Sequence, residues 1–225
     1  MRGRNRMSFN IAIDGPAGAG KSTIAKKIAA KKGYIYVDTG AMYRAMALYL
    51  LREHVDPSQS EEIDKKCQDA DITIAYENGE QVVYLNGENV NGYIRTEEVG
   101  NMASVSSPNP RVRKKLVELQ QKLAAGTDVV MDGRDIGTCV LPDAQVKVYL
   151  TADSSVRALR RYHELTAKGV SCDLATIEQD IIERDRQDMT REISPLKQAK
   201  DAVLLDSSHM TVDEVVDAVI ALCEA

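Results

Sequence analysis

The sequence predicts an α/β fold in which a doubly wound, five-stranded parallel sheet carries helices on both faces. Short apolar runs rich in β-branched residues alternate with longer stretches of helical periodicity, and one region with two Asn-Gly pairs breaks this alternation. Continuous apolar runs are typical of parallel strands that are buried on both faces. A β-α-β-α order along the chain favours a doubly wound sheet.

The individual elements follow from the hydrophobic pattern. The predicted parallel strands are residues 10–14, 34–38, 128–132, 146–151 and 202–206. The predicted helices are residues 23–32, 41–51, 110–125, 154–167, 174–189 and 211–223. In residues 71–95, two β-prone runs flank Asn78-Gly79, which is a strong hairpin signal. A second pair, Asn86-Gly87, predicts a third short strand, so we expect a small antiparallel insert.

The chain length fits one α/β domain that carries an insertion. We expect residues 1–7 to form a disordered extension and residues 8–225 to form a single domain. Within it, residues 56–95 are predicted to be an inserted subdomain, and residues 157–191 a helical lid. Basic residues open the chain without a following apolar segment, which argues against a secretory signal.

Charge and cysteine content narrow the function. The net charge is −5, yet six arginines fall between Arg157 and Arg191, which favours a pocket for compact anions and argues against general nucleic-acid binding. The four cysteines are too scattered for a C-x-x-C pair, so we expect reduced thiols and a cytoplasmic protein without a zinc site. Since no apolar run approaches the ~18 residues of a membrane span, no membrane partner is expected.

A phosphate-binding motif is the most specific signal in the chain. Residues 15–22 read Gly-Pro-Ala-Gly-Ala-Gly-Lys-Ser, a complete G-x-x-x-x-G-K-[ST] loop between a predicted strand and a predicted helix. In such a loop, of the P-loop NTPase type, backbone N–H groups point at phosphate oxygens, the lysine reaches the β- and γ-phosphates, and the hydroxyl ligates Mg²⁺. The predicted triphosphate contacts are Gly15, Pro16, Ala17, Gly18, Ala19, Gly20, Lys21, Ser22 and Thr23.

Three predicted strands end in an aspartate, namely Asp14, Asp38 and Asp132. Ligands of an open parallel sheet bind beyond the carboxyl ends of its strands, so these carboxylates are candidates to hold Mg²⁺ together with Ser22. We favour Asp132 and Asp38 over Asp14, the alternative role being a helix or turn cap. No guanine-reading Asn/Thr-Lys-x-Asp segment follows residues 202–206, which favours ATP over GTP.

Arginines cluster on two neighbouring predicted helices. Arg157, Arg160 and Arg161 stand at i, i+3 and i+4, and therefore share one helix face. Arg184, Arg186 and Arg191 follow near the end of the next helix. We interpret the two helices as a cationic flap that closes over phosphates and excludes water, with Arg157 and Arg161 on ATP. The alternative is a solvated face whose arginines pair with nearby carboxylates.

Taken together, these motifs resemble those of the bacterial cytidylate kinases. The resemblance covers residues 10–225 and rests on the phosphate loop, Asp38-Thr39-Gly40-Ala41-Met42-Tyr43-Arg44, Ile94-Arg95-Thr96, Asp132-Gly133-Arg134-Asp135 and Glu183-Arg184-Asp185-Arg186. It implies transfer of the γ-phosphoryl group of ATP to CMP or dCMP with Mg²⁺, which gives CDP or dCDP and ADP.

The resemblance also implies an acceptor site, and it implies that the inserted subdomain over residues 56–95 binds the acceptor nucleotide. By position in the family pattern, Arg44, Arg134 and Arg191 would hold the acceptor phosphate, while Tyr43, Arg184 and Asp188 would lie along the sugar. Ser104, Arg113 and Asp135 would read the base, where a carboxylate accepts the exocyclic amine of cytosine. Thr39 stands where many relatives carry serine and keeps the hydroxyl. Lys21, Arg134 and Arg191 would form the catalytic set.

Two alternatives remain at this stage. The first is another small-molecule kinase, with UMP, AMP or shikimate as acceptor. The second is a non-catalytic or switch-type nucleotide binder that acts on a protein partner. We expect a monomer whose partners are ATP and CMP or dCMP, and the preference between CMP and dCMP and the tolerance of UMP stay open.

Overall fold

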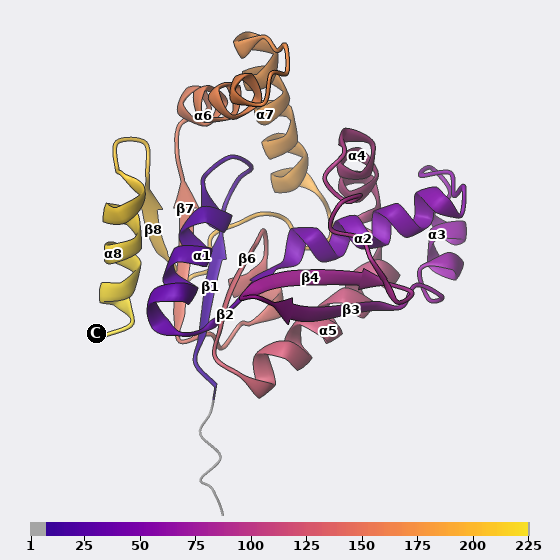
Figure 1. Ribbon diagram of the computed structural model, residues 1–225, viewed down its shortest axis with the longest axis horizontal. Coiled ribbons are helices and arrows are strands. Elements are labelled where there is room, and N and C mark those ends of the chain that lie inside the picture. Colours follow the sequence, from indigo (N-terminus) through magenta and orange to yellow (C-terminus); the bar gives the residue numbers. More distant parts are fainter. Residues whose placement is uncertain (1–7, 225) are drawn as a thin grey trace, which may run out of the picture. The chain divides into compact units, whose positions relative to one another are not determined.

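The computed structural model describes residues 8–224, and the expected extension over residues 1–7 lies outside this range. The chain divides into two compact units. Unit 1 comprises the residues up to Ile35 and those from Thr127 onward, and unit 2 comprises Tyr36–Gly126. Figure 1 labels the helices and strands of both units.

The main sheet is five-stranded, with the strand order β2-β6-β1-β7-β8. Unit 1 contains β1 (Asn10–Asp14), α1 (Lys21–Lys32), β6 (Val129–Gly133), a short π-helical turn η1 (Ile136–Val140), β7 (Val146–Thr151), α6 (Ser154–Ala167), α7 (Leu174–Thr190), β8 (Val203–Asp206) and α8 (Val212–Leu222). The remaining strand, β2 (Ile35–Asp38), begins at the last residue of unit 1's first segment. The parallel sheet confirms the predicted fold class.

Strand β1 lies between β6 and β7, with which it pairs in parallel. Its residues Ile11, Ala12 and Ile13 are fully buried, as the continuous apolar run predicts. The register places Ile13 opposite Asp132 and Asp14 opposite Gly133. The carboxyl ends of β1 and β6 therefore lie side by side, directly before the phosphate loop.

Helices α6 and α7 pack against each other, and Figure 1 shows them side by side in orange. Their contact has a small core of its own, formed by Ala158, Ile177 and Ile181, against which Tyr162, Leu165 and Cys172 pack. The apolar periodicity of these two helices thus serves a local contact between them. They form one helical hairpin, which we call the flap.

Unit 2 combines helices with a three-stranded antiparallel sheet of order β3-β4-β5. Its elements are α2 (Thr39–Arg52), α3 (Ser60–Lys66), β3 (Ile72–Glu77), β4 (Glu80–Leu85), β5 (Glu88–Asn89), α4 (Glu97–Ser106) and α5 (Pro110–Gly126). The turn between β3 and β4 has Asn78 at φ 53° and Gly79 at φ 81°. Both positive angles are those of a type I′ hairpin turn, and the predicted hairpin with its third short strand is confirmed.

Helix α2 organises the packing of unit 2. Met42, Met46 and Leu50 are fully buried at helical spacing, and α2 contacts both α4 and α5. The predicted elements do not include α3, α4 or η1. A signal for α4 exists, because the Thr96 hydroxyl accepts a hydrogen bond from the backbone N–H of Val99 and two glutamates fill the first turn.

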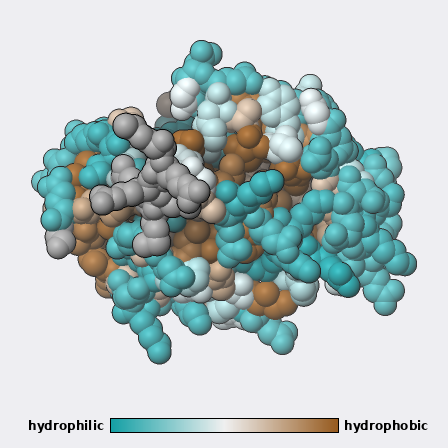
Figure 2. All heavy atoms as spheres, turned by 90° about the horizontal axis from the view of Figure 1, so that it is seen from below, coloured by the Kyte–Doolittle hydropathy of each residue, from teal (hydrophilic) through white to brown (hydrophobic). Residues whose placement is uncertain are grey.

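Hydrophobic side chains reach the surface in several places. In Figure 2 they show as brown areas between hydrophilic side chains. The exposed ones include Val203 and Leu204 of β8 and Val212 of α8. Apolar side chains at the surface are ordinary in folded proteins and do not by themselves indicate a binding site. Over residues 8–224, every helix falls short of the length or the apolar character that a membrane crossing demands.

Candidate active site

The phosphate loop connects β1 to α1 over residues 15–20, and its backbone depends on glycine at two of these positions. Gly15 and Gly18 adopt φ 150° and 75°. A Cβ at Gly15 would stand 1.9 Å from the carbonyl oxygen of Leu150, and one at Gly18 would stand 3.3 Å from the Cβ of Arg157. Glycine is required at position 15 by this close approach and favoured at position 18 by its backbone angle.

Lys21 opens α1 and is 6% exposed. Its Nζ donates a hydrogen bond to the carbonyl oxygen of Pro16, at 2.7 Å. Burial, followed by the positive charge of Arg134, lowers the pKa of Lys21 to about 7, although Asp132 and Asp14 act in the opposite direction. A buried ammonium group at a helix N-terminus is suited to bind an anion, which would restore its charge.

Ser22 and Asp132 meet beside the loop. The Ser22 hydroxyl donates to Oδ2 of Asp132 over 2.9 Å, and Asp132 is 5% exposed. A hydroxyl and a carboxylate are oxygen ligands of the kind that Mg²⁺ prefers, and Mg²⁺ is usually held by one or two protein ligands plus substrate phosphates. Within residues 8–224 no group of three His, Cys, Asp or Glu residues could hold a metal. The residues present therefore fit a metal that arrives with a nucleotide.

Asp14 has a different environment from Asp132. Its two carboxylate oxygens accept the backbone N–H groups of Ile136 and Gly137, each at 2.7 Å. Burial raises the pKa of Asp14 to about 6 despite these two bonds. The carboxylate therefore fixes the start of η1, directly after Asp135.

Asp188 brings together two of the predicted phosphate-binding arginines. Its Oδ2 lies 2.7 Å from Nε of Arg134, and its Oδ1 lies 3.9 Å from Nη1 of Arg191. Nε of Arg191 donates to the carbonyl oxygen of Ser194 at 2.6 Å. Burial, and then the charge of Arg134, lowers the pKa of Arg184. Arg134 near the end of β6 and Arg191 directly after α7 thus share the Asp188 carboxylate and, with the buried cation of Arg184 nearby, form what we call the Asp188-centred cluster.

The three flap arginines that share a predicted face have three environments. Arg157 is buried and bonded to backbone and to Asp185. Arg160 donates to the carbonyl oxygen of Ser207 at 2.7 Å. Arg161 pairs with Glu164 at 2.9 Å, with about half of each side chain exposed. Arg160 and Arg161 are both exposed, and the exposed ion pair of Arg161 is weak enough to exchange partners.

A cavity of about 550 Å³ in unit 1 adjoins the loop. Loop residues and all three flap arginines line one part of it, and Ser207, Met210, Val212 and Val215 line another. The second group does not appear among the sequence-predicted site residues, because the segment after β8 carries no motif. Apolar side chains next to polar anchors are typical of a pocket for a flat ring.

Five predicted site residues and Asp38 lie in unit 2. Thr39, Tyr43 and Arg44 belong to α2, Ser104 to α4 and Arg113 to α5, and α2 contacts both other helices. The guanidinium of Arg113, itself buried, lies 5.8 Å from the centre of the Tyr43 ring. Asp38 accepts the N–H of Ala41 and pairs with Arg95 at 2.7 Å, so it caps α2 in the structure.

The predicted base-reading residues are divided between the units. Ser104 and Arg113 belong to unit 2, whereas Asp135 belongs to unit 1 and is 4% exposed. The chain turns at Asp135, whose carbonyl oxygen accepts the N–H of Cys139 at 2.9 Å.

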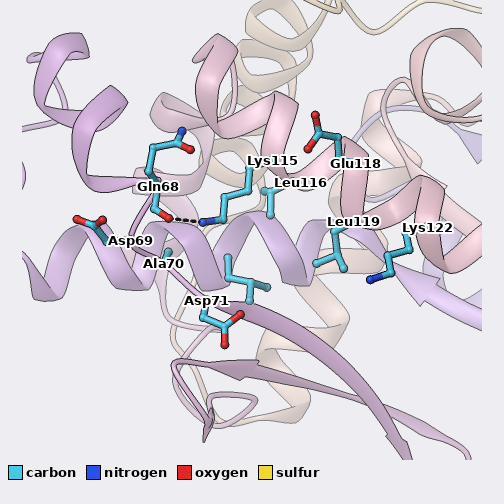
Figure 3. Close-up of a pocket in the computed structure, with 10 residues that line it drawn as sticks. Gln68, Asp69, Ala70, Asp71, Lys115, Leu116, Glu118, Leu119 and Lys122 are labelled. Atoms are coloured by element: carbon cyan, nitrogen blue, oxygen red, sulfur yellow. Dashed lines mark hydrogen bonds between the residues drawn. The ribbon is translucent and has the colours of Figure 1, made fainter.

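A shallower cavity of about 450 Å³ in unit 2 has a different character. Figure 3 shows Lys115 donating to the carbonyl oxygen of Gln68, a bond of 2.6 Å. Leu116 and Ala70 are buried among its lining residues, and charged residues of both signs, such as Asp71 and Lys122, also line it. Because its charges are mixed and its polar side chains are not buried, this cavity is not a candidate site for phosphates.

Comparisons with solved structures show the fold. The structure resembles shikimate kinase from Bacteroides thetaiotaomicron with a TM-score of 0.50 at 14% identity, covering 96% of this chain and 99% of that one. It also resembles an uncharacterized protein from Eubacterium ventriosum with a TM-score of 0.53 at 14% identity, covering 97% and 99%. At this identity the likeness concerns architecture alone.

Comparisons of sequence are more specific. The chain is 49% identical over 216 residues to a cytidylate kinase from Ligilactobacillus salivarius, covering 96% of each chain. It is 52% identical over 208 residues to one from Lactobacillus gasseri, covering 92% of this chain and 90% of that one. A cytidylate kinase from Bacillus subtilis is 45% identical over 216 residues, or 96% of each chain. A family model described as cytidylate kinase matches residues 11–225, and the chain belongs to the cytidylate kinase family.

Proposed function

We propose that the protein transfers the γ-phosphoryl group of ATP to CMP or dCMP and releases CDP or dCDP and ADP. Membership of the cytidylate kinase family makes it a nucleoside monophosphate kinase that acts on CMP. The observation that carries the mechanism is the glycine loop, whose tight backbone stands before a buried lysine at the start of α1.

The donor site is proposed at this loop. The backbone N–H groups of residues 15–23 and the Lys21 ammonium would bind the ATP phosphates. The cavity of unit 1 would take the rest of the nucleotide, and its apolar wall of Met210, Val212 and Val215 suits a flat base. Arg161, with its exposed ion pair, is the flap arginine best placed to exchange Glu164 for a phosphate.

Mg²⁺ is proposed to bind at Ser22 and Asp132. Both ligand atoms are oxygens, and they are 2.9 Å apart. When bound, the ion would neutralise part of the negative charge on the donor phosphates. Asp38 was the other predicted metal ligand, and its cap on α2 and its pair with Arg95 give it a second role.

The acceptor contacts are proposed residue by residue. In unit 1, Arg134 and Arg191 would hold the acceptor phosphate, Arg184 and Asp188 the sugar, and Asp135 the base. In unit 2, Arg44 would bind phosphate, Tyr43 the sugar, and Ser104 and Arg113 the base, with Thr39 near them. The Asp188-centred cluster supports this assignment, because Arg134 and Arg191 already share one carboxylate partner.

The reaction needs no general base. An oxygen of the acceptor phosphate, already an anion, forms a bond to the γ-phosphorus while the bond from that phosphorus to the bridging oxygen of ADP breaks. Alignment of the two nucleotides and neutralisation of the charge on the transferring group then supply most of the rate. Lys21, Arg134 and Arg191 would provide fixed cations, and the flap would keep water out so that ATP is not hydrolysed.

The place of action is proposed to be the cytoplasm, with ATP and CMP or dCMP as partners of a monomer. The four cysteines support a reducing compartment, since all of them are free in the structure.

A panel of acceptors tests the function. ADP release should be measured with CMP, dCMP, UMP, AMP and shikimate at fixed ATP and Mg²⁺. We expect rapid release with CMP and dCMP and at least tenfold lower kcat/KM with the others. Equal turnover of UMP and CMP would contradict the proposed base contacts. ATP consumption that does not depend on any acceptor would instead indicate a nucleotide binder of the switch type.

A further inference from the structure

The side chain of Arg157 is held by three segments of unit 1. Its Nε donates to the carbonyl oxygen of Ala152 at 2.8 Å, at the end of β7. Its Nη1 donates to the carbonyl oxygen of Ala17 at 2.9 Å, within the phosphate loop. Its Nη2 lies 2.7 Å from Oδ2 of Asp185 on α7. Each nitrogen of the guanidinium is thus engaged by the protein itself.

The contact with the loop is close as well as polar. A Cβ at Gly18 would stand 3.3 Å from the Cβ of Arg157, so the loop backbone packs directly on this turn of α6. Ala17 and Gly18 belong to the stretch whose N–H groups would face phosphate. The Ala17 carbonyl and the Gly18 N–H belong to one peptide group. The hydrogen bond from Arg157 to this carbonyl therefore helps to set the direction of the N–H.

Asp185 depends in turn on Arg157. The side chains of the two residues are 6% and 12% exposed. The other carboxylate oxygen of Asp185, Oδ1, has no hydrogen-bond partner in the part of the chain that the structure describes. A buried carboxylate with so few partners is stabilised mainly by its cation, and removal of either partner leaves an uncompensated buried charge.

We propose that Arg157 is a positioning residue, which together with Asp185 fixes the Ala17–Gly18 part of the phosphate loop against the flap. ATP affinity then depends on Arg157 through the loop backbone and not through contact between the guanidinium and a phosphate. This role differs from the direct phosphate contact that the sequence pattern suggests for the flap arginines. Arg160 and Arg161, which have other partners, do not share it.

The inference rests on the proposed donor site. It predicts a different effect on the affinities for ATP and ADP than a direct phosphate contact would. A guanidinium that touched the γ-phosphate would favour ATP over ADP. A guanidinium that shapes the loop affects both nucleotides alike, because both place phosphates in the loop. It also requires Asp185, which a direct contact would not.

The test is a double-mutant cycle with Arg157→Gln, Asp185→Asn and the double variant. The dissociation constants of ATP and ADP should be measured by titration calorimetry with Mg²⁺, beside melting temperatures. Arg52→Gln is the matched control, since Arg52 also forms an ion pair with a carboxylate, that of Glu88, but lies on α2 of unit 2 with its side chain 41% exposed. We expect each single variant to weaken ATP and ADP at least tenfold, with the ATP-to-ADP ratio within twofold of wild type. The double variant should bind no more than about twofold more weakly than the weaker of the two single variants, and Arg52→Gln should bind like wild type.

Other outcomes overturn the proposal. Selective loss of ATP binding in Arg157→Gln, with Asp185→Asn unaffected, would show direct phosphate contact. Unchanged affinities with lowered melting temperatures would show a purely structural pair. If Arg157→Gln does not fold, Arg157→Lys replaces it in the test, because a lysine cannot contact Ala152, Ala17 and Asp185 at once. The same ratio of ATP and ADP dissociation constants then decides the outcome. Failure of the wild type itself to bind ATP would overturn the proposed donor site, and only then would both ideas fall together.

Discussion

At the scale of single residues, Lys21 combines burial with a proposed role, binding of ATP phosphates, that needs its positive charge. The ligand-free pKa of about 7 means that most of these side chains are neutral at pH 8. Phosphate oxygens beside the ammonium would favour the charged form and raise this pKa. Binding of ATP must then take up protons in the interval above pH 7, where the free protein has lost them.

We therefore expect close to one proton to be taken up per ATP bound at pH 8, and close to none from Lys21 at pH 6. Since the free enzyme must be protonated first, ATP affinity should fall as the pH rises above 7. Titration calorimetry in two buffers of different ionisation enthalpy measures the uptake. Lys31→Gln on the same helix, with its side chain half exposed, is the control and should leave the uptake unchanged. Proton uptake of zero at pH 8 would contradict a lowered pKa at Lys21.

The part of the unit 1 cavity that is lined by residues after β8 could not be predicted from the sequence. Met210, Val212 and Val215 have the composition of an ordinary helix start, and they line the cavity beside the phosphate loop because α8 packs beside α1. The phosphate loop could be predicted because the whole motif is contiguous. The wall could not, because its partners are about 190 residues away in sequence.

At the scale of elements, the hairpin of unit 2 offers a direct test of backbone conformation. Gly79 has φ 81° with open space around it, whereas Gly100 lies within α4, also with open space. An alanine at position 79 must adopt a left-handed conformation, which costs roughly 1–2 kcal/mol. An alanine at position 100 gains roughly 0.5–1 kcal/mol, because glycine is unfavourable inside a helix.

The expected result is a pair of opposite shifts, with Gly79→Ala lowering the urea midpoint and Gly100→Ala raising it. Because neither new methyl group meets another atom, the difference isolates the backbone. Equilibrium urea unfolding followed by circular dichroism gives both midpoints. A Gly79→Ala variant as stable as wild type would be incompatible with the positive φ at this turn.

The elements also show which predictions depend on local signals. Strands β1 and β7 have the predicted bounds, since buried parallel strands are continuous apolar runs. Helices α3 and α4 and the turn η1 were missed. Helix α3 has seven residues and only Ile63 buried, and η1 is held by Asp14 from a distant strand. Short elements that depend on such contacts leave little periodicity to detect.

At the scale of the whole molecule, the proposed acceptor residues come from both compact units of the chain. Thr39, Tyr43, Arg44, Ser104 and Arg113 belong to unit 2, and the Asp188-centred cluster and Asp135 belong to unit 1. No contiguous motif spans such a set, so these assignments depended on resemblance to a family. The shared face of the flap arginines was visible in the sequence, but their separate environments were not. Those environments are set by Ser207 and Asp185, which belong to other elements.

Asp135 carries the last prediction, because acceptor choice is a property of the complete enzyme. The exocyclic amine of cytosine donates a hydrogen bond that a carboxylate accepts, whereas uracil would present a carbonyl oxygen to it. In Asp135→Asn the side-chain amide can donate to that carbonyl, so the ratio of kcat/KM for CMP over UMP should fall at least tenfold while the KM for ATP changes less than threefold.

Asp143→Asn, an exposed position of unit 1, is the control and should keep the wild-type ratio. Melting curves of both variants separate a specificity change from unfolding, since Asp135 is buried. A folded Asp135→Asn enzyme that discriminates against UMP as strongly as the wild type would mean that this carboxylate does not face the base.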